Sequence, residues 1–186
     1  VADERAVALL REWIAQMKSE QTFVRDWTFD DLSPALDQLK ADRSLESGRD
    51  AFRQTGCIQC HRFAGEGGSV GPDLTGISRR LSSRDLLESI VLPSKTIAEG
   101  YATTEIETKS GEIISGRVER EDDRVLVMRP PTATEDMVTI RKADIRRRAL
   151  SQTSNMPGGM LNTLTAPQIL DLLAYLLSDR DVAVFP

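Results

Sequence analysis

The stretch that decides the fold is Cys57-Ile58-Gln59-Cys60-His61, in which two thiols lie three positions apart and an imidazole follows directly. The chain has two cysteines and one histidine in 186 residues, so this pentapeptide holds all of them. Cys-x-x-Cys-His is the spacing for covalent haem attachment, because each thiol can add across one porphyrin vinyl group. The sequence therefore predicts one covalently bound haem c, attached to Cys57 and Cys60, with His61 as an iron ligand.

Two other interpretations of the cysteine pair fit less well. A thioredoxin-like redox site expects a strand before the pair and a helix after it, whereas here Gly56 ends a helical stretch and a glycine-rich loop follows. A structural zinc site needs four ligands, mostly Cys and His. The chain has too few of these, so carboxylates would have to supply the remaining ligands.

Composition limits the other possibilities. With 40% hydrophobic residues the chain can bury a core, and a net charge of −5 does not indicate nucleic acid as a partner. No apolar run approaches the roughly 18 residues that a membrane-spanning helix needs. The chain opens at Val1 in a charged amphipathic helix without a signal peptide, so we expect a mature form or a piece of a longer protein. Covalent haem attachment predicts a location in the periplasm or otherwise outside the cytoplasm.

Periodicity and capping signals predict the elements. Helical spacing of apolar residues predicts helices over 3–18, 34–40, 45–54, 83–92 and 166–178, with Phe29 in a loop before the second. Between residues 97 and 150 the period changes to alternation, which predicts strands over 102–107, 113–119, 124–128, 137–140 and 144–148. Such short strands suggest a small closed barrel or a strongly bent sheet. The loop over 62–75 is rich in glycine and can wrap closely around a flat ligand.

Several motifs together resemble a known family. They are Gly48-x-x-x-Phe52 before the attachment stretch, Gly71-Pro72-Asp73-Leu74, a Met-Pro loop, and Leu172-Leu173-Ala174-Tyr175-Leu176 near the end. The chain resembles a single-haem class I c-type cytochrome. More closely it is similar to the haem-binding domain described from planctomycetes and related bacteria, through Cys60-His61-Arg62, Gly67 to Thr75, Pro93-Ser94 and Ser154-Asn155-Met156-Pro157-Gly158-Gly159. The resemblance covers about residues 27–178.

The resemblance implies a mainly α cytochrome c fold, α+β overall because of an inserted small antiparallel β-barrel. We expect an N-terminal helical extension over 1–43, a haem domain made of 44–96 and 151–186, and the insert over 97–150. The family also implies that the first and last helices of the haem domain cross closely, with Gly48 letting Tyr175 approach. The Pro72 carbonyl is expected to accept a hydrogen bond from His61.

The sixth position of the iron needs a second ligand or stays open. With no second histidine, the five methionines are the main candidates, and three of them lie on or beside predicted helices and strands. Met156 and Met160 lie in the segment before the last helix, and Met156 is favoured because Pro157 restricts the backbone beside it. Met160, an open site, or a lysine or other group remain as alternatives. Arg80, or else Arg79 or Arg62, is expected to pair with a haem propionate.

The leading functional hypothesis is electron transfer, not enzymatic catalysis. His/Met ligation favours reduced iron relative to His/His ligation. The resemblance implies that the chain serves as a domain or redox partner of a periplasmic dehydrogenase. One alternative is an open-site haem sensor or peroxidase-like enzyme. Another is a binding module built on the β insert, in which Arg146-Arg147-Arg148 would contact an acidic partner. The eleven acidic and ten basic residues of 97–150 do not favour nucleic acid.

Overall fold

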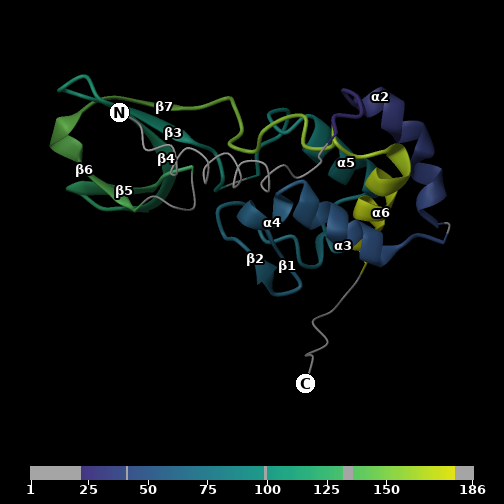
Figure 1. Cartoon of the computed structure of the whole chain (residues 1–186). Helices are drawn as coiled ribbons and strands as arrows, with labels where there is room; N and C mark the ends of the chain where they lie inside the picture. The colour runs from purple at the N-terminus through teal and green to yellow at the C-terminus, as the bar shows by residue number, and fades with distance from the viewer. Residues whose placement is uncertain (1–21, 41, 99, 132–135, 179–186) are drawn as a thin grey trace, which may run out of the picture.

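The computed structural model describes residues 22–40, 42–98, 100–131 and 136–178 (Figure 1). The helix predicted over 3–18 lies outside these residues. The first part of the described chain is helical: α2 (Phe29–Leu32), the 3-10 helix η1 (Ser33–Lys40), α3 (Leu45–Gln54), α4 (Cys57–Cys60), the hairpin strands β1 (Arg62–Phe63) and β2 (Glu66–Gly67), η2 (Ile77–Arg79) and α5 (Ser83–Val91). The sheet strands β3 (Thr104–Thr108), β4 (Ile113–Glu121), β5 (Val125–Arg129), β6 (Val138–Arg141) and β7 (Ile145–Leu150) follow, with η3 (Lys142–Asp144) between the last two, and then α6 (Ala166–Leu177).

The helices begin where side chains can satisfy their free backbone N–H groups. Ser44 Oγ accepts a hydrogen bond from Ser47 N before α3, and reciprocal capping boxes precede α5 and α6. A further capping box, between Thr28 and Asp31, was not predicted. Thr28 is the N-cap of α2, which begins at Phe29, so the placement of Phe29 in a loop is wrong.

The close crossing of α3 and α6 organises the helical part. Gly48 is buried at this crossing, and a Cβ built on it would lie 2.2 Å from the Asp171 carbonyl oxygen and 2.6 Å from the Tyr175 Cβ. Beside the crossing, the ring of Tyr175 packs edge-on against Phe63 at 4.8 Å and lies 6.1 Å from Phe52. The surrounding core is contributed by α2, α3, η2, α5, the loop before α6, and α6 itself.

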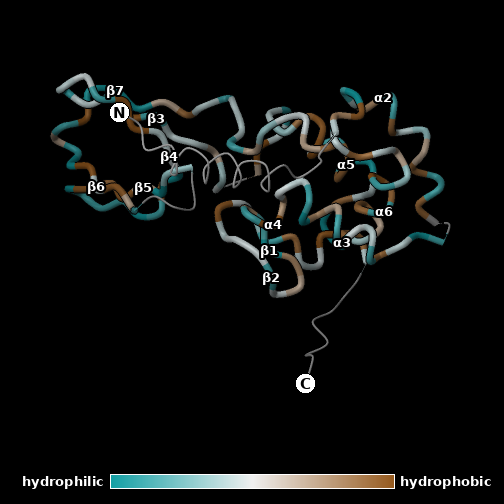
Figure 2. The backbone as a smooth tube through the Cα atoms, in the orientation of Figure 1, coloured by the Kyte–Doolittle hydropathy of each residue, from teal (hydrophilic) through white to brown (hydrophobic). Residues whose placement is uncertain are grey.

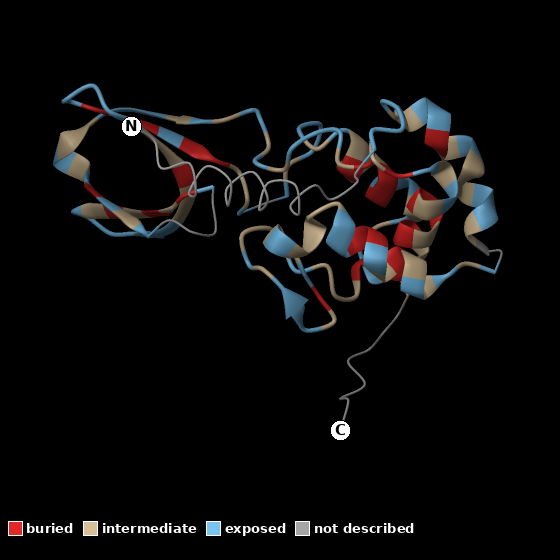
Figure 3. Cartoon of the chain, in the orientation of Figure 1, coloured by how far each residue is buried: buried red, intermediate tan, exposed pale blue. Residues whose placement is uncertain are grey.

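The sheet has a separate core. Its strands are antiparallel in the order β6-β5-β4-β3-β7, and it buries Ile106, Leu126, Met128 and Ile140 together. Ile106 on β3 and Ile140 on β6 share this core although their strands are not neighbours, so the sheet must bend. Register shifts at Val118/Arg120 and Glu107/Thr108 are consistent with that bend. Figure 3 shows the buried segments concentrated in these two places, and Figure 2 shows the hydrophobic segments there too.

The prediction of a closed barrel is not confirmed. Closure would require a ladder between the end strands β6 and β7, and the described strands form an open sheet without one. β7 pairs with β3 instead, and η3 separates it from β6. The five-strand count and the antiparallel arrangement were predicted correctly; the strand boundaries differ by a few residues.

The segment before α2 is tied to the loop that precedes α6. Val24 N donates to Asn162 O at 2.8 Å, Trp27 N donates to Asn162 Oδ1 at 3.2 Å, and the Trp27 indole N–H donates to Leu164 O at 2.9 Å. Trp27 therefore anchors this segment to the helical part. In the described part of the chain, no helix combines the length and the hydrophobicity needed to cross a membrane.

We predict that Gly48→Ala destabilises the protein. Alanine normally favours a helix, but here its methyl group would overlap the α6 backbone and force α3 and α6 apart. Overpacking of this kind costs about 1–3 kcal/mol in the free energy of unfolding, measurable by denaturant titration. Gly158→Ala is the matched control, since a Cβ there meets nothing within 4 Å. Equal stability of the two variants would contradict the close-crossing argument.

Candidate functional site

The attachment stretch forms a single helical turn. Gly56 adopts the left-handed conformation (φ 79°) between α3 and α4, which lets the chain turn sharply before Cys57. Residues 57–60 form α4, and His61 N donates to Cys57 O at 2.9 Å to close the turn. Cys57 and Cys60 are both free thiols and half-buried. One short element therefore carries both predicted attachment thiols and the predicted iron ligand.

The Cys57 thiol is held by Thr55. Thr55 Oγ1 lies 3.2 Å from Cys57 Sγ and 2.8 Å from Ala51 O, an oxygen to which its hydroxyl can donate. Burial raises the pKa of the Cys57 thiol, and the Thr55 contact only partly opposes this. In the unmodified chain Cys57 is therefore a protonated thiol with a fixed orientation.

The His61 ring is oriented by the loop that follows it. Nδ1 lies 2.9 Å from the Pro72 carbonyl oxygen. A carbonyl oxygen can only accept, so Nδ1 carries the proton and Nε2 keeps the lone pair that can bind a metal. Pro72 is the residue predicted to make this contact.

Three glycines let the loop after His61 pack against the attachment stretch. A Cβ on Gly67 would lie 2.1 Å from His61 O, and one on Gly68 would lie 2.1 Å from Gln59 O. A Cβ on Gly71 would lie 2.5 Å from His61 Cε1. The glycine-rich composition predicted a loop that wraps a ligand, whereas these three glycines lie against the protein's own backbone and the His61 ring.

A pair of arginines ties the β1–β2 hairpin to α3. Glu66 accepts from Arg49 Nη2 at 2.6 Å and from Arg53 Nη2 at 2.9 Å. The hydrogen bond from Arg53 is the main cause of a lowered Glu66 pKa, and the charge of Arg49 adds to it. Sequence reasoning missed this contact. The i, i+4 spacing of the two arginines was its only signal, and nothing in the sequence indicated the acidic partner.

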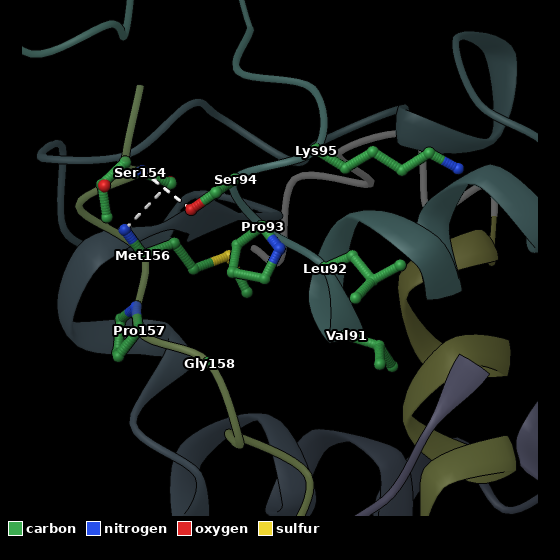
Figure 4. A pocket seen from close by; sticks show the side chains of 10 residues that line it. Val91, Leu92, Pro93, Ser94, Lys95, Ser154, Met156, Pro157 and Gly158 are labelled. Atoms are coloured by element: carbon green, nitrogen blue, oxygen red, sulfur yellow. Dashed lines mark hydrogen bonds between the residues drawn. The ribbon is translucent and has the colours of Figure 1, made fainter. Parts of the chain in front are cut away.

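Met156 lies in the loop between β7 and α6, at a cavity of about 580 Å³ (Figure 4). The cavity lies between the end of α5 and the Met156 loop; its lining residues are Val91, Leu92, Pro93, Ser94, Lys95, Thr153, Ser154, Met156, Pro157 and Gly158. In Figure 4 the Met156 thioether extends toward Pro93. Met160 is half-buried and is not among these lining residues.

The predicted propionate partner has other contacts in this structure. Arg80 Nη2 donates to Asp73 O at 2.7 Å and is 3.4 Å from Thr75 O, so Arg80 holds the loop that carries Pro72. Arg62 and Arg79 are exposed. A contact from Arg80 to a haem propionate stays a prediction.

The described residues fit a haem c. Attachment needs two accessible thiols one helical turn apart, and Cys57 and Cys60 meet that need. The His61 Nε2 is available for a metal, and Cys57 and Met156 both pack at the margin of the helical core. Within the described ranges, no three His, Cys, Asp or Glu side chains gather as an alternative metal site.

Comparison with known families gives one match. Residues 45–121 match the family model described as Cytochrome c, from the start of α3 to the end of β4. No curated protein matches the chain. The matched region contains Cys57, Cys60 and His61, and the match to a cytochrome c domain implies covalently bound haem c. Domains of this family are typically electron-transfer modules. The match continues past residue 96, so it does not test the predicted domain boundary.

We predict that Gly71→Ala displaces the His61 ring. The new methyl group would overlap the ring atoms, so the ring must leave the Pro72 carbonyl or the loop must shift. We expect a loss of about 1–3 kcal/mol in stability and an altered haem absorption spectrum. An unchanged spectrum of Gly71→Ala would show that the ring does not depend on this contact.

Proposed function

We propose that this protein carries single electrons through a haem c with His61 and Met156 as the axial ligands. The observation that supports this best is the hydrogen bond between His61 Nδ1 and Pro72 O, because it presents Nε2 in one orientation. Met156 is the preferred second ligand, since it packs against the same hydrophobic cluster as Cys57, whereas Met160 is not part of that cluster. When bound, haem c supplies an iron ion that can gain or lose one electron.

The chain's own residues provide rigidity. Thioether bonds from Cys57 and Cys60 would hold the group at α4, and α4 is fixed in turn by the glycine contacts with the following loop. The Pro72 carbonyl restrains the His61 ring, and the backbone of Met156 is restrained by a hydrogen bond to Ser154. Ligands that keep their positions in both oxidation states reduce the structural change on electron transfer, which suits a carrier.

The finer assignments are also proposals. We place the haem domain in 44–96 and 151–186 and the insert in 97–150, supported by the two separate hydrophobic cores. The family of haem-binding domains described from planctomycetes and related bacteria fits the motifs quoted above. A dehydrogenase as redox partner and a periplasmic location follow from that resemblance.

We expect Met156→Ala to abolish the far-red absorption band that marks methionine-ligated ferric haem. Removing the thioether removes the sulfur ligand, whereas Met160→Ala is the matched control and should keep the band. The measurement is an optical spectrum of the oxidised protein. If only Met160→Ala loses the band, the ligand is Met160.

The reduced protein is expected to bind carbon monoxide slowly. A bound Met156 sulfur occupies the sixth position and must leave before the gas can bind. Stopped-flow mixing of the reduced protein with carbon monoxide measures this rate. Rapid binding by the unchanged protein would instead favour the open-site sensor or peroxidase-like alternative.

A further inference from the structure

The chain runs from the helical part into the sheet through one segment and returns through a second segment that lies beside the first. The outgoing segment follows α5 through Pro93, Ser94 and Lys95, and the returning segment runs from Ser151 to Pro157. Two hydrogen bonds join these segments: Ser151 N donates to Thr103 O at 2.8 Å, and Ser154 N donates to Ser94 Oγ at 3.1 Å. Residues 60 positions apart are thereby connected at the base of the sheet.

The second of these bonds continues to Met156. Ser154 Oγ accepts from Met156 N at 3.1 Å, so Ser94, Ser154 and Met156 form one hydrogen-bonded series (Figure 4). All three residues line the 580 Å³ cavity, to which the end of α5 also contributes Val91 and Leu92. The next residue, Pro157, has no N–H group. The Met156 N–H is therefore the last backbone donor before Pro157.

The outgoing segment, which carries Ser94, is itself held to the end of α5. Lys95 N donates to Leu92 O at 2.9 Å, and Lys95 Nζ pairs with Glu88 Oε1 at 2.6 Å. These contacts hold Lys95, the residue after Ser94, to the end of α5. The returning loop, in contrast, has no helix or strand between β7 and α6. Its position at Met156 therefore depends strongly on Ser94 and Ser154.

We propose that Ser94 and Ser154 are positioning residues that hold the Met156 thioether in place from the base of the inserted sheet. This inference rests on the proposed function, in which Met156 is the sixth ligand.

The test compares Ser94→Ala, Ser154→Ala and the conservative Ser94→Thr in the full haem-loaded chain. Loss of one hydrogen bond weakens the restraint by a factor of about five, so carbon monoxide should bind the reduced alanine variants about five times faster. Their far-red band should also weaken, while Ser94→Thr, which keeps the hydroxyl, should behave as the unchanged protein. Mass spectrometry should show the same haem content in every variant.

Ser89→Ala is the matched control, because Ser89 is a serine of α5 whose hydroxyl bonds Asp85 O outside the series. If both alanine variants keep the band and the binding rate while Met156→Ala loses the band, the positioning role is wrong and the ligand assignment stands. If Met156→Ala keeps the band, the proposed ligation fails, and this inference fails with it. Ser154→Ala tests the same series should Ser94→Ala prove unstable.

Discussion

The contact between α3 and α6 at Gly48 is the constraint on which the helical part depends. Because residue 48 has no side chain, the two helices approach until their backbones nearly touch. That approach places Phe52 and Tyr175 beside Phe63, the residue that follows the attachment stretch by two positions. The position of α4 is thus determined by a packing contact between segments more than 120 residues apart in the chain.

Around α4 the protein uses backbone contacts in place of side chains. Gly67 and Gly68 lie against carbonyl groups of the attachment stretch, and Gly71 lies against the His61 ring. The same loop then supplies the Pro72 carbonyl, and Arg80 holds that loop through Asp73 O. A ring fixed in this way needs little reorganisation to bind a metal. The hydrogen bond between His61 Nδ1 and Pro72 O is therefore stronger evidence for function than the Cys-x-x-Cys-His motif alone.

The inserted sheet is connected to this site through its base. Its own core of Ile106, Leu126, Met128 and Ile140 is separate from the helical core, so it can keep its shape independently. Its returning segment, however, leads directly into the Met156 loop and is bonded to Ser94. Among the described strands, β6 and β7 are the two ends of this open sheet, whereas a closed barrel would have no end strands.

The cofactor, the approximate bounds of α3, α5 and α6, and the five strands of the larger sheet could be predicted from local sequence patterns, whereas α2, α4 and the β1–β2 hairpin could not. Cys-x-x-Cys-His is chemically specific within five residues, and caps such as Ser44 and Ser82 act locally. Tertiary structure alone decided that the sheet stays open, that Glu66 meets Arg49 and Arg53, that Gly71 lies on the His61 ring, and that Ser94 meets Ser154. Each of these depends on the separation in space of residues distant along the chain, and no local pattern of residue types encodes that separation.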